Sequence, residues 1–382
     1  MNNMMEPKIR FKGFEGEWKE YSFSDILIVN SGKDYKHLDN GIIPVYGTGG
    51  YMLSVNESLS DIDAIGIGRK GTIDKPQYLK APFWTVDTLF FLTTKNNDNL
   101  DFLYNLSQNI KWKKYDESTG VPSLSKSNID KIKTHIPYIA EQQEIASYFT
   151  SLDSQISAAT SRLAALKQMK AASLQAMFPQ EGETVPKIRF KGFEGEWKKV
   201  KLSEILTERH ENSTITDSLP QLSFTIADGV IRPEDRKSNK RDFLIKDIDN
   251  KRYLVTKVGD IIYNPANVVY GAIHRNSLMN GVVSPIYKIF TTMQDSNFIE
   301  CAVRRPSFIT KLAMCTEGTV TKLKTLKPEA FLNMEVCITP SLEEQKLIGN
   351  YFTSLDRQIS LQSQRLEKLK QIKSACLDKM FV

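Results

Sequence analysis

The sequence predicts an α+β protein in which two mixed α/β domains are separated by two long helices, which pair as an antiparallel coiled coil with pseudo-twofold symmetry. Three observations lead to this prediction. The thirteen residues PKIRFKGFEGEWK occur twice, from Pro7 to Lys19 and from Pro186 to Lys198. A second repeat with helical periodicity closes each copy. The interiors between the repeats contain short apolar runs broken by turn residues, which are typical of strands.

The closing repeats run from Glu141 to Phe178 and from Glu344 to Phe381, with YFTSLD, QIS, RL, LKQ and MF unchanged. The offset between copies is 179 residues at the opening repeat and 203 at the closing one, so the interiors differ in length by 24 residues. A chain that repeats its ends and varies its middles is suited to present two different surfaces in one fixed arrangement.

Apolar residues in each closing repeat alternate in steps of four and three, which is the spacing of a narrow coiled-coil seam. Two such helices in one chain most simply satisfy each other, with one globular module at each end. About 37 residues at ~1.5 Å rise give a spacer of roughly 55 Å. Ala159 and Gln362 take equivalent positions in the seam, where Gln362 is either a register-setting residue or a tolerated imperfection. The predicted interface residues are Ile145, Phe149, Leu152, Ile156, Leu163, Leu166, Ile348, Phe352, Leu355, Ile359, Leu366 and Leu369.

These patterns divide the chain into five segments. We expect a first domain over residues 1–140, a helix over 141–178, a linker over 179–185, a second domain over 186–342 and a second helix over 343–382. Pro179, Gly182 and Pro186 end the first helix. Strands are expected at IIPVYG, DAIGIG and FWTVDTLFFL in the first domain, and at RYLVTKVGDIIYN and GVVSPIYKIF in the second. Shorter helices are expected around residues 100–113 and 297–315.

Composition excludes several classes of protein. The formal net charge of +6, from 51 basic and 45 acidic residues, favours a polyanionic partner only weakly. The 4 cysteines lie in the second half without CxxC spacing, which predicts neither a disulfide framework nor a zinc site. The first residues lack an apolar signal region, and no window approaches the roughly 20 apolar residues of a membrane span. We therefore expect a cytoplasmic protein with no membrane association.

Catalytic motifs are missing or incomplete. Residues 66–71, GIGRKG, have the glycine spacing of a dinucleotide fingerprint, but Pro76 soon blocks the helix that this fold requires. Residues 264–267, NPAN, resemble the segment that orients the target amine in amino-group methyltransferases, yet lack its second proline and aromatic residue. The chain contains no GxxxxGK[ST], HExxH or GxSxG motif, and its 4 histidines stand far apart. We expect no catalytic residue, no metal ligand and no enzyme activity of its own.

Polar, glycine-containing turns are better candidates for function. They include residues 46–51 and 118–126 in the first domain and residues 264–267, 274–276 and 317–322 in the second. Small hydroxyl, amide and cationic side chains on turns supply the donors and acceptors that base edges and phosphates require. The turn at residues 66–71 adds Arg69 and Lys70, which suit phosphates or guanine edges. Ordinary solvated surface loops are the alternative interpretation.

The combined pattern resembles the specificity subunit of type I restriction-modification systems, often called HsdS, over nearly the whole chain. The resemblance is carried by KIRFKGFEGEWK, by EQQEIASYFTSLD and EQKLIGNYFTSLD, and by the RLxxLKQxK continuations, each present twice. IGRKGTI, PFWTVDTLFFL, YGAI and GVVSPIYKIF are similar to core strands of that family's target recognition domains. Residues 318–340 depart from the family pattern, so loop correspondences are less secure in the second domain.

The resemblance implies a non-catalytic, DNA-reading subunit for phage defence. Each target recognition domain would bind one half of a bipartite site in double-stranded DNA, and the helices would set the spacer between the halves. Two modification subunits would carry S-adenosylmethionine and methylate adenine N6. Two restriction subunits would use ATP and Mg for translocation and cleavage, so this chain itself would bind no cofactor.

We expect the bases and phosphates of each half-site to be contacted from the turns. The candidate residues for the first half-site are Thr48, Arg69, Lys70, Ser123, Ser125 and Lys126. Those for the second are Asn264, Asn267, His274, Arg275, Thr319 and Lys322. One alternative is a coiled-coil scaffold that binds protein without sequence-specific DNA binding. Another is a self-sufficient enzyme, which the motifs do not favour.

Overall fold

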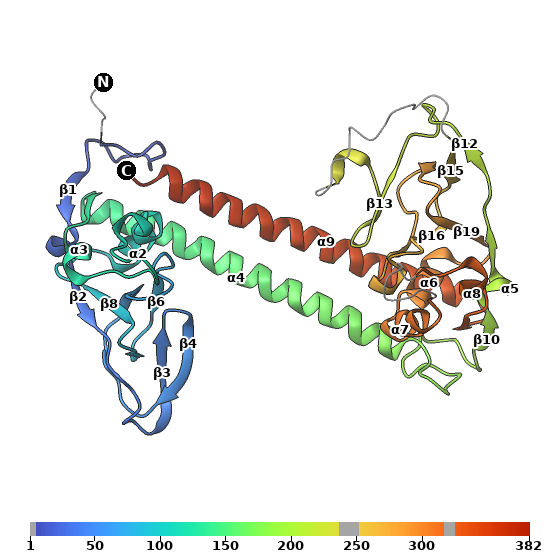
Figure 1. Ribbon diagram of the computed structural model, residues 1–382, viewed down its shortest axis with the longest axis horizontal. Coiled ribbons are helices and arrows are strands. Elements are labelled where there is room, and N and C mark those ends of the chain that lie inside the picture. Colours follow the sequence, from blue (N-terminus) through green and yellow to red (C-terminus); the bar gives the residue numbers. More distant parts are fainter. Residues whose placement is uncertain (1–4, 237–251, 317–324) are drawn as a thin grey trace. The chain divides into compact units, whose positions relative to one another are not determined.

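The computed structural model describes residues 5–236, 252–316 and 325–382. The chain folds into two compact units: unit 1 contains residues Met1–Ser161 and Ser363–Val382, and unit 2 contains residues Arg162–Gln362. Two helices of 38 residues each, α4 (Ile139–Ala176) and α9 (Leu342–Lys379), contribute to both units (Figure 1). Each unit is therefore built from one repeated copy and from the end of the other copy's closing helix.

Unit 1 contains a four-stranded antiparallel sheet in the order β2-β8-β5-β6, a three-stranded sheet β4-β3-β7 and the antiparallel pair β1-β9. Its strands are β1 (Lys19–Ser22), β2 (Leu27–Ser31), β3 (Asn40–Gly47), β4 (Gly50–Val55), β5 (Ala64–Gly68), β6 (Gln77–Leu79), β7 (Trp84–Thr85), β8 (Leu89–Thr94) and β9 (Lys133–Ile136). Its short helices are α1 (Phe23–Ile26), α2 (Leu100–Asn109), the 3₁₀ turn η1 (Trp112–Tyr115) and α3 (Lys126–Asp130).

Unit 2 repeats this plan with a four-stranded sheet β11-β19-β16-β17, a three-stranded sheet β12-β15-β18 and the pair β10-β20, and it adds the hairpin β13-β14. Its strands are β10 (Lys198–Lys201), β11 (Leu206–Glu208), β12 (Asn212–Ser213), β13 (Ser223–Thr225), β14 (Gly229–Ile231), β15 (Tyr253–Thr256), β16 (Ile261–Tyr263), β17 (Ile273–Arg275), β18 (Gly281–Val283), β19 (Lys288–Thr292) and β20 (Glu335–Ile338). Its shorter helices are α5 (Leu202–Ile205), η2 (Pro233–Asp235), η4 (Val268–Tyr270), α6 (Ser296–Val303), α7 (Pro306–Met314) and α8 (Pro328–Leu332).

The apolar runs of the sequence form the central strands, because these strands are buried on both faces. All five residues of β5 are buried, and so are the first five of β8. Ile65 and Ile67 join one hydrophobic cluster, whereas Ala64 joins another on the opposite face, as expected when side chains alternate along a strand. Each predicted run contains strand, but FWTVDTLFFL, RYLVTKVGDIIYN and GVVSPIYKIF each hold two separate strands: β7 and β8, β15 and β16, and β18 and β19. The expected helix around residues 297–315 is divided in two, because Pro306 starts α7 as a separate helix.

A buried ion pair joins the opening repeat to the closing repeat in each unit. The Arg10 guanidinium donates two hydrogen bonds of 2.8 Å to the Glu141 carboxylate, and Arg189 donates bonds of 2.6 and 2.8 Å to Glu344. The Glu141 and Glu344 side chains are 2% and 0% exposed. Such a carboxylate is tolerated in the interior because the planar guanidinium satisfies both of its oxygens.

The glutamine that follows each of these glutamates anchors a short helix that comes earlier in the same copy. Gln142 accepts a hydrogen bond from the backbone N–H of Asn99, which caps α2. Gln345 accepts one from the backbone N–H of Asp295, which caps α6. The repeated Glu-Gln pair therefore sets the position of the opening repeat and of one short helix with the same chemistry in both units.

The two long helices are antiparallel in each unit. In unit 1, Tyr148 Oη lies 3.4 Å from Cys376 Sγ, and Lys373 donates to Asp153 at 2.6 Å. In unit 2, the equivalent contacts are exchanged between the helices: Ser173 Oγ lies 2.9 Å from Tyr351 Oη, and Lys170 pairs with Asp356. The residue number rises along α4 as it falls along α9 in both sets. The α+β class and the antiparallel helix pairing are thereby confirmed.

The repeated Met-Phe at each helix end packs into the core of the other copy. Phe381 contacts the ring of Trp18 at a centroid distance of 6.3 Å, and Phe178 contacts Trp197 at 5.6 Å. Each tryptophan belongs to an opening repeat, so each core includes residues from both copies. Neither unit has a complete core without the helix that comes from the other copy.

We predict that Phe381→Ala destabilises unit 1 by about 3–5 kcal/mol, because it removes a buried ring from a close-packed cluster. Tryptophan fluorescence during urea unfolding measures this loss, since Trp18, Trp84 and Trp112 lie in unit 1 and only Trp197 lies in unit 2. Val382→Ala is the control, because Val382 is 44% exposed. Equal midpoints for the two variants would contradict the shared core.

We also predict that Glu344→Ala costs about 3–5 kcal/mol of stability, because it leaves the Arg189 guanidinium without its buried partner. The neighbouring Glu343 is exposed, so Glu343→Ala provides a matched loss of one carboxylate. Urea unfolding with limited proteolysis of unit 2 measures the difference. A Glu344→Ala protein as stable as the Glu343→Ala protein would show that the ion pair does not anchor the repeats.

Candidate nucleic-acid interface

Three turns meet in unit 1 and bring the sequence-predicted residues together. Thr48 lies in the β3–β4 turn, Arg69 and Lys70 follow β5, and Ser123 precedes α3. Backbone contacts connect the last two turns: Lys70 and Ser123 form an isolated antiparallel bridge, and the Leu124 N–H donates to Arg69 O at 2.9 Å. Gln77 Nε2 donates to Thr48 O at 3.2 Å and so connects the first turn to the start of β6.

Glycines allow the turn after β5 to fold back closely. A Cβ on Gly68 would lie only 2.0 Å from the carbonyl oxygen of Thr72, and Gly71 has a φ of +90°. A residue with a Cβ is therefore excluded at Gly68, and it would have a strained backbone at Gly71. The turn leads into a strand and not into a helix. This strand, β6, pairs antiparallel with β5. The glycine spacing therefore belongs to a strand hairpin and not to a dinucleotide-binding fold.

Arg69 and Lys70 are both exposed, and neither lies within ion-pair distance of a carboxylate in the described part of the chain. Arg69 lies over the Phe90 ring, with its guanidinium carbon 5.7 Å from the ring centroid. This stacking restricts the side chain at a low cost because the aromatic face attracts the cation. Two adjacent cations without internal partners can bind an external anion.

Asp116 organises the loop that carries Ser123. One carboxylate oxygen accepts hydrogen bonds from the backbone N–H of Ser123 at 2.9 Å and from the backbone and hydroxyl of Ser118 at 3.0 and 2.9 Å. These hydrogen bonds hold the pKa of Asp116 below its usual value, and the bond from the Ser123 backbone has the largest effect. A carboxylate with a lowered pKa stays charged at neutral pH, and the loop loses this support only as the pH falls through that lowered pKa.

Ser125 and Lys126 begin α3. Ser125 Oγ accepts the backbone N–H of Asn128 at 3.2 Å and donates to Glu117 at 3.1 Å, so it serves as the N-cap of the helix. Lys126 is exposed at the first helical position. Of this pair, Lys126 is available to an external partner, whereas the Ser125 hydroxyl is already used within the protein.

Unit 2 places a different turn at the end of the equivalent central strand. Asn264 follows β16, its side chain accepts the backbone N–H of Ala266 at 3.0 Å, and its N–H donates to Ala272 O at 2.9 Å. Asn267 is half-buried and precedes η4. Asn264 therefore shapes the turn with its side-chain oxygen, while its amide nitrogen makes no hydrogen bond to the described residues and remains a candidate donor.

His274 and Arg275 do not lie on the surface as the sequence analysis expected. His274 is 4% exposed, with Nε2 2.8 Å from Ile226 O and Nδ1 3.5 Å from Glu300 Oε1. The Arg275 side chain is 14% exposed and faces Glu300 at 3.9 Å. Both side chains lie largely inside unit 2, and Arg275 Nε makes no hydrogen bond among the described residues. Their contact with bases stays a prediction that this burial does not favour. Thr319 and Lys322 lie outside the described residues.

Several exposed apolar side chains beside these turns were missed by the sequence analysis. Tyr51 follows the β3–β4 turn and is 63% exposed, Val121 in the loop before α3 is 68% exposed, and Tyr270 ends η4 at 71%. Each is adjacent to a glycine or proline or lies within two residues of one, which is the only signal in the sequence. Aromatic rings and aliphatic groups at such positions can stack on bases or contact thymine methyl groups.

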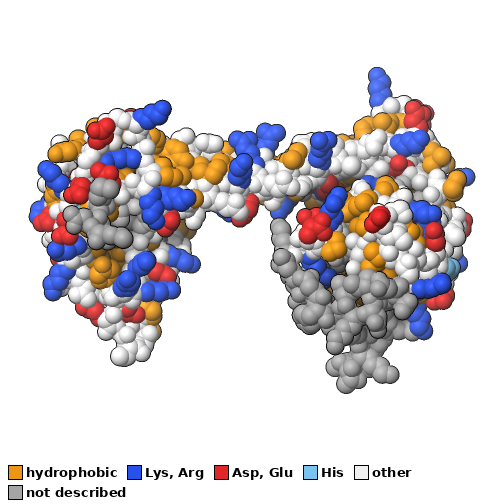
Figure 2. Space-filling view, turned by 90° about the horizontal axis from the view of Figure 1, so that it is seen from above, with side chains coloured by type: hydrophobic (Ala, Val, Ile, Leu, Met, Phe, Trp, Pro, Cys, Tyr) orange, Lys and Arg blue, Asp and Glu red, His pale blue; other side chains and the backbone are white. Residues whose placement is uncertain are grey.

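Charges of both signs are mixed over the visible face of each unit (Figure 2). This agrees with the small net charge of +6. Long-range attraction to a polyanion is weak under these conditions. The described residues contain no group of three or more His, Cys, Asp or Glu side chains placed to hold a metal ion. No helix among the described residues is long and apolar enough to cross a bilayer.

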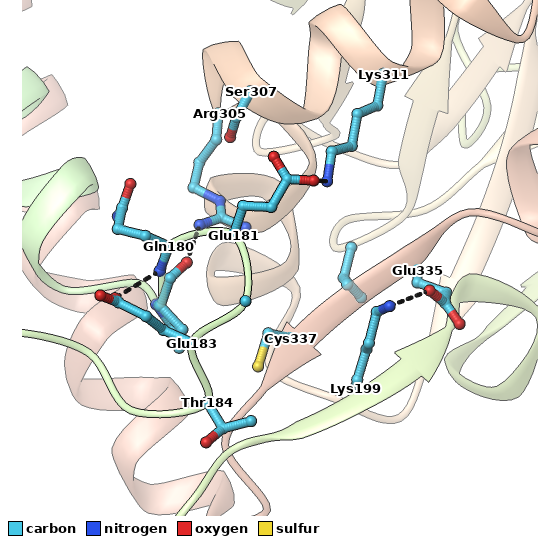
Figure 3. A pocket seen from close by; sticks show the side chains of 13 residues that line it. Gln180, Glu181, Glu183, Thr184, Lys199, Arg305, Ser307, Lys311, Glu335 and Cys337 are labelled. Atoms are coloured by element: carbon cyan, nitrogen blue, oxygen red, sulfur yellow. Dashed lines mark hydrogen bonds and ion pairs between the residues drawn. The ribbon is translucent and has the colours of Figure 1, made fainter.

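A cavity of about 400 Å³ in unit 2 lies between residues 179–184, strands β10 and β20 and the start of α7 (Figure 3). Its lysines are paired: Lys311 with Glu181 at 2.8 Å and Lys199 with Glu335 at 2.6 Å. Arg305 donates to Pro179 O at 3.1 Å and lies 4.9 Å from the centroid of the Phe178 ring. These contacts fasten the linker to the domain, and the paired charges do not favour a ligand.

Comparison with known proteins identifies the family. Residues 15–168 and 194–371 match the family described as Type I restriction modification DNA specificity domain. The Type I restriction enzyme MjaVIII specificity subunit of Methanocaldococcus jannaschii is 23% identical over 344 residues, which is 84% of this chain and 75% of that protein.

Among solved structures, the S subunit of a type I restriction-modification system from M. genitalium superposes with a TM-score of 0.70 at 14% identity, over 99% of each chain. An HsdS subunit from Thermoanaerobacter tengcongensis has a TM-score of 0.41 at 12% identity, over 95% of this chain and 96% of that one. The first of these shows a common fold. The family match covers both repeated copies, and the chain therefore belongs to the type I restriction-modification DNA specificity family.

Proposed function

We propose that this chain is the sequence-reading subunit of a type I restriction-modification complex, and that units 1 and 2 each read one half of a bipartite DNA target. The observation that carries this proposal is the placement of unlike turns on like strands. Arg69 and Lys70 follow the central strand β5, and Asn264 and Asn267 follow its equivalent β16. A common frame with different side chains at the same place would read two different half-sites.

The two half-sites would be read with different chemistry. Two exposed cations suit guanine O6 and N7 or phosphates, whereas asparagine amides suit adenine N6 and N7. Backbone phosphates would position each unit and make binding depend on salt, and the turn side chains would choose the bases. Within each half-site, affinity and specificity thus come from separate groups.

The long helices would set the number of unread base pairs between the half-sites and would dock two methyltransferase subunits. Met169 on α4 and Ile372 on α9 occupy equivalent positions of the closing repeats, and they are 50% and 36% exposed. Exposed apolar side chains at equivalent positions would offer the same surface to two identical partners. S-adenosylmethionine would be bound by those partners, because methylation of adenine N6 needs an extruded base and a pocket that holds it. Restriction subunits that use ATP and Mg would join the same complex.

We predict that Arg69→Ala combined with Lys70→Ala weakens DNA binding by the complex with its methyltransferase subunits, since two cations that face the nucleic acid are lost. If both contact phosphates, the slope of log affinity against log salt falls by up to about 2. Lys80→Ala is the control, because Lys80 is exposed at the opposite end of the β5–β6 pair. Titrations at several salt concentrations measure both affinity and slope, and equal affinities with equal slopes for all three proteins would exclude this turn from the interface.

We further predict that four residues inserted after Ser161 and four after its equivalent Gln364 lengthen the unread spacer by about two base pairs, from ~1.5 Å rise per helical residue and ~3.4 Å per base pair. The matched insertions preserve the contacts within each unit, including Asp153 with Lys373 and Lys170 with Asp356. Sequencing of methylated DNA from cells that express the chain with its methyltransferase identifies both half-sites and the spacer. A changed half-site with an unchanged spacer would refute the role of the helices.

The same sequencing separates this function from that of a protein-binding scaffold. A reader produces one bipartite motif that depends on this chain, whereas a scaffold leaves methylation without sequence preference. A single short contiguous motif would contradict the assignment of one half-site to each unit.

A further inference from the structure

The hairpin β13–β14 distinguishes unit 2 from unit 1. It forms a two-stranded sheet of its own, and no equivalent two-stranded hairpin occurs in the described residues of unit 1. Its strands pack on the face of the four-stranded sheet opposite to the helices: Phe224 and Val230 join the cluster that contains Ile262 and Ile289. The hairpin is therefore part of what makes the interior of the second copy different from the first.

His274 holds the tip of this hairpin. Its Nε2–H donates to Ile226 O at 2.8 Å, since a carbonyl oxygen accepts, and its ring makes an edge contact with Phe224 at a centroid distance of 5.7 Å. Gly229 at the tip has a φ of +67°, and a Cβ there would lie 2.7 Å from His274 Cγ. The backbone of the tip thus lies directly on the imidazole, and only glycine leaves room for it.

Glu300 on α6 fixes the other side of the imidazole. Its carboxylate lies 3.5 Å from His274 Nδ1, accepts the Arg275 N–H at 3.1 Å and pairs with Arg304 at 3.3 Å. Burial raises the pKa of Glu300, but the hydrogen bond from His274 and the charge of Arg304 outweigh burial and leave that pKa below its usual value. The residue that faces the histidine is therefore a stable carboxylate at neutral pH.

These contacts form one continuous connection from the repeated frame to the tip. Gln345 of the closing repeat holds the N-cap of α6, α6 carries Glu300, and Glu300 faces His274. The orientation of the hairpin is thereby set against the same frame that orients the rest of unit 2.

The tip presents two side chains that have no partner of their own in the described residues. Ile226 is 45% exposed, and Asp228 is exposed with no ion-pair partner in the described ranges. His274 pairs with Ile262, two residues before Asn264, so the residue that holds the tip lies on the strand pair that ends in the Asn264 turn. The hairpin thus adds an aliphatic group and a carboxylate to the part of unit 2 built on β16 and β17.

We propose that the tip of the β13–β14 hairpin reads bases of the second half-site through Ile226 and Asp228, and that His274 is the positioning residue that holds it in register. The proposal rests on the proposed function of the chain. Ile226 contacts a thymine methyl group, and Asp228 accepts a hydrogen bond from an exocyclic amine of cytosine or adenine. A carboxylate repels phosphates, so Asp228 contributes to base choice and not to general affinity.

The first test changes only exposed side chains, which leaves the fold intact. Methylation sequencing first maps the bipartite target of the wild-type complex. Binding of the complex with its methyltransferase subunits is then measured on DNA libraries in which one half-site at a time is randomised. For the double variant Ile226→Ser with Asp228→Ser, we expect roughly tenfold less discrimination at one or more positions of one half-site, and none lost at the other.

The second test separates positioning from stability. His274→Ala is expected to lose discrimination at the same base positions, and His274→Gln, which keeps a side-chain donor toward Ile226 O, is expected to recover part of it. His210→Ala is the matched control, because the His210 side chain is 78% exposed in the same unit. Replacement of thymine by deoxyuridine removes only the methyl group and should reduce wild-type affinity at the position that Ile226 contacts, but not the affinity of the tip variant.

Unchanged base preferences in the double variant would overturn the inference, and so would a uniform loss of affinity for every sequence. These outcomes differ from a failure of the proposed function, in which the wild-type complex itself would show no bipartite motif. If His274→Ala does not fold, the double variant at the tip still decides the question.

Discussion

The buried pairs Arg10–Glu141 and Arg189–Glu344 are the constraint on which the rest of the structure depends. Each guanidinium belongs to an opening repeat and each carboxylate to the first turn of a long helix. A buried carboxylate without its guanidinium would be very unfavourable, so the helix can start in only one place relative to the opening repeat. The glutamine after each glutamate then fixes the position of one short helix in the same unit, α2 or α6. The same arrangement occurs in both units, which explains why these residues are repeated while the interiors differ.

The second constraint is that each core is completed by the other copy's helix. Phe381 and Phe178 are buried against Trp18 and Trp197, and the interhelical pairs of unit 1 recur in unit 2 with the helices exchanged. A copy folded alone would expose the apolar surface that these phenylalanines cover. Each unit therefore needs the end of a second closing repeat to complete its core, and the duplication supplies it within one chain.

Against this constant frame, the variable turns account for the difference between the two units. Unit 1 offers two exposed cations after β5, and unit 2 offers asparagines after β16 together with an additional hairpin. Strands buried on both faces tolerate little change, whereas turns at their ends accept new residues without disturbing the core. A frame of this kind can thus keep its core while its turns change.

The sequence by itself determined the duplication, the two long helices, the main strands and the family, because exact repeats and heptad spacing are visible along the chain. It also located Arg69, Lys70 and Asn264 at strand ends. Only the tertiary structure decided which polar side chains face solvent. His274 lies in a polar stretch of sequence, yet Glu300 and Ile226, which are distant along the chain, enclose it. Burial and hydrogen-bond partners depend on residues brought together from far apart, and no local pattern encodes them.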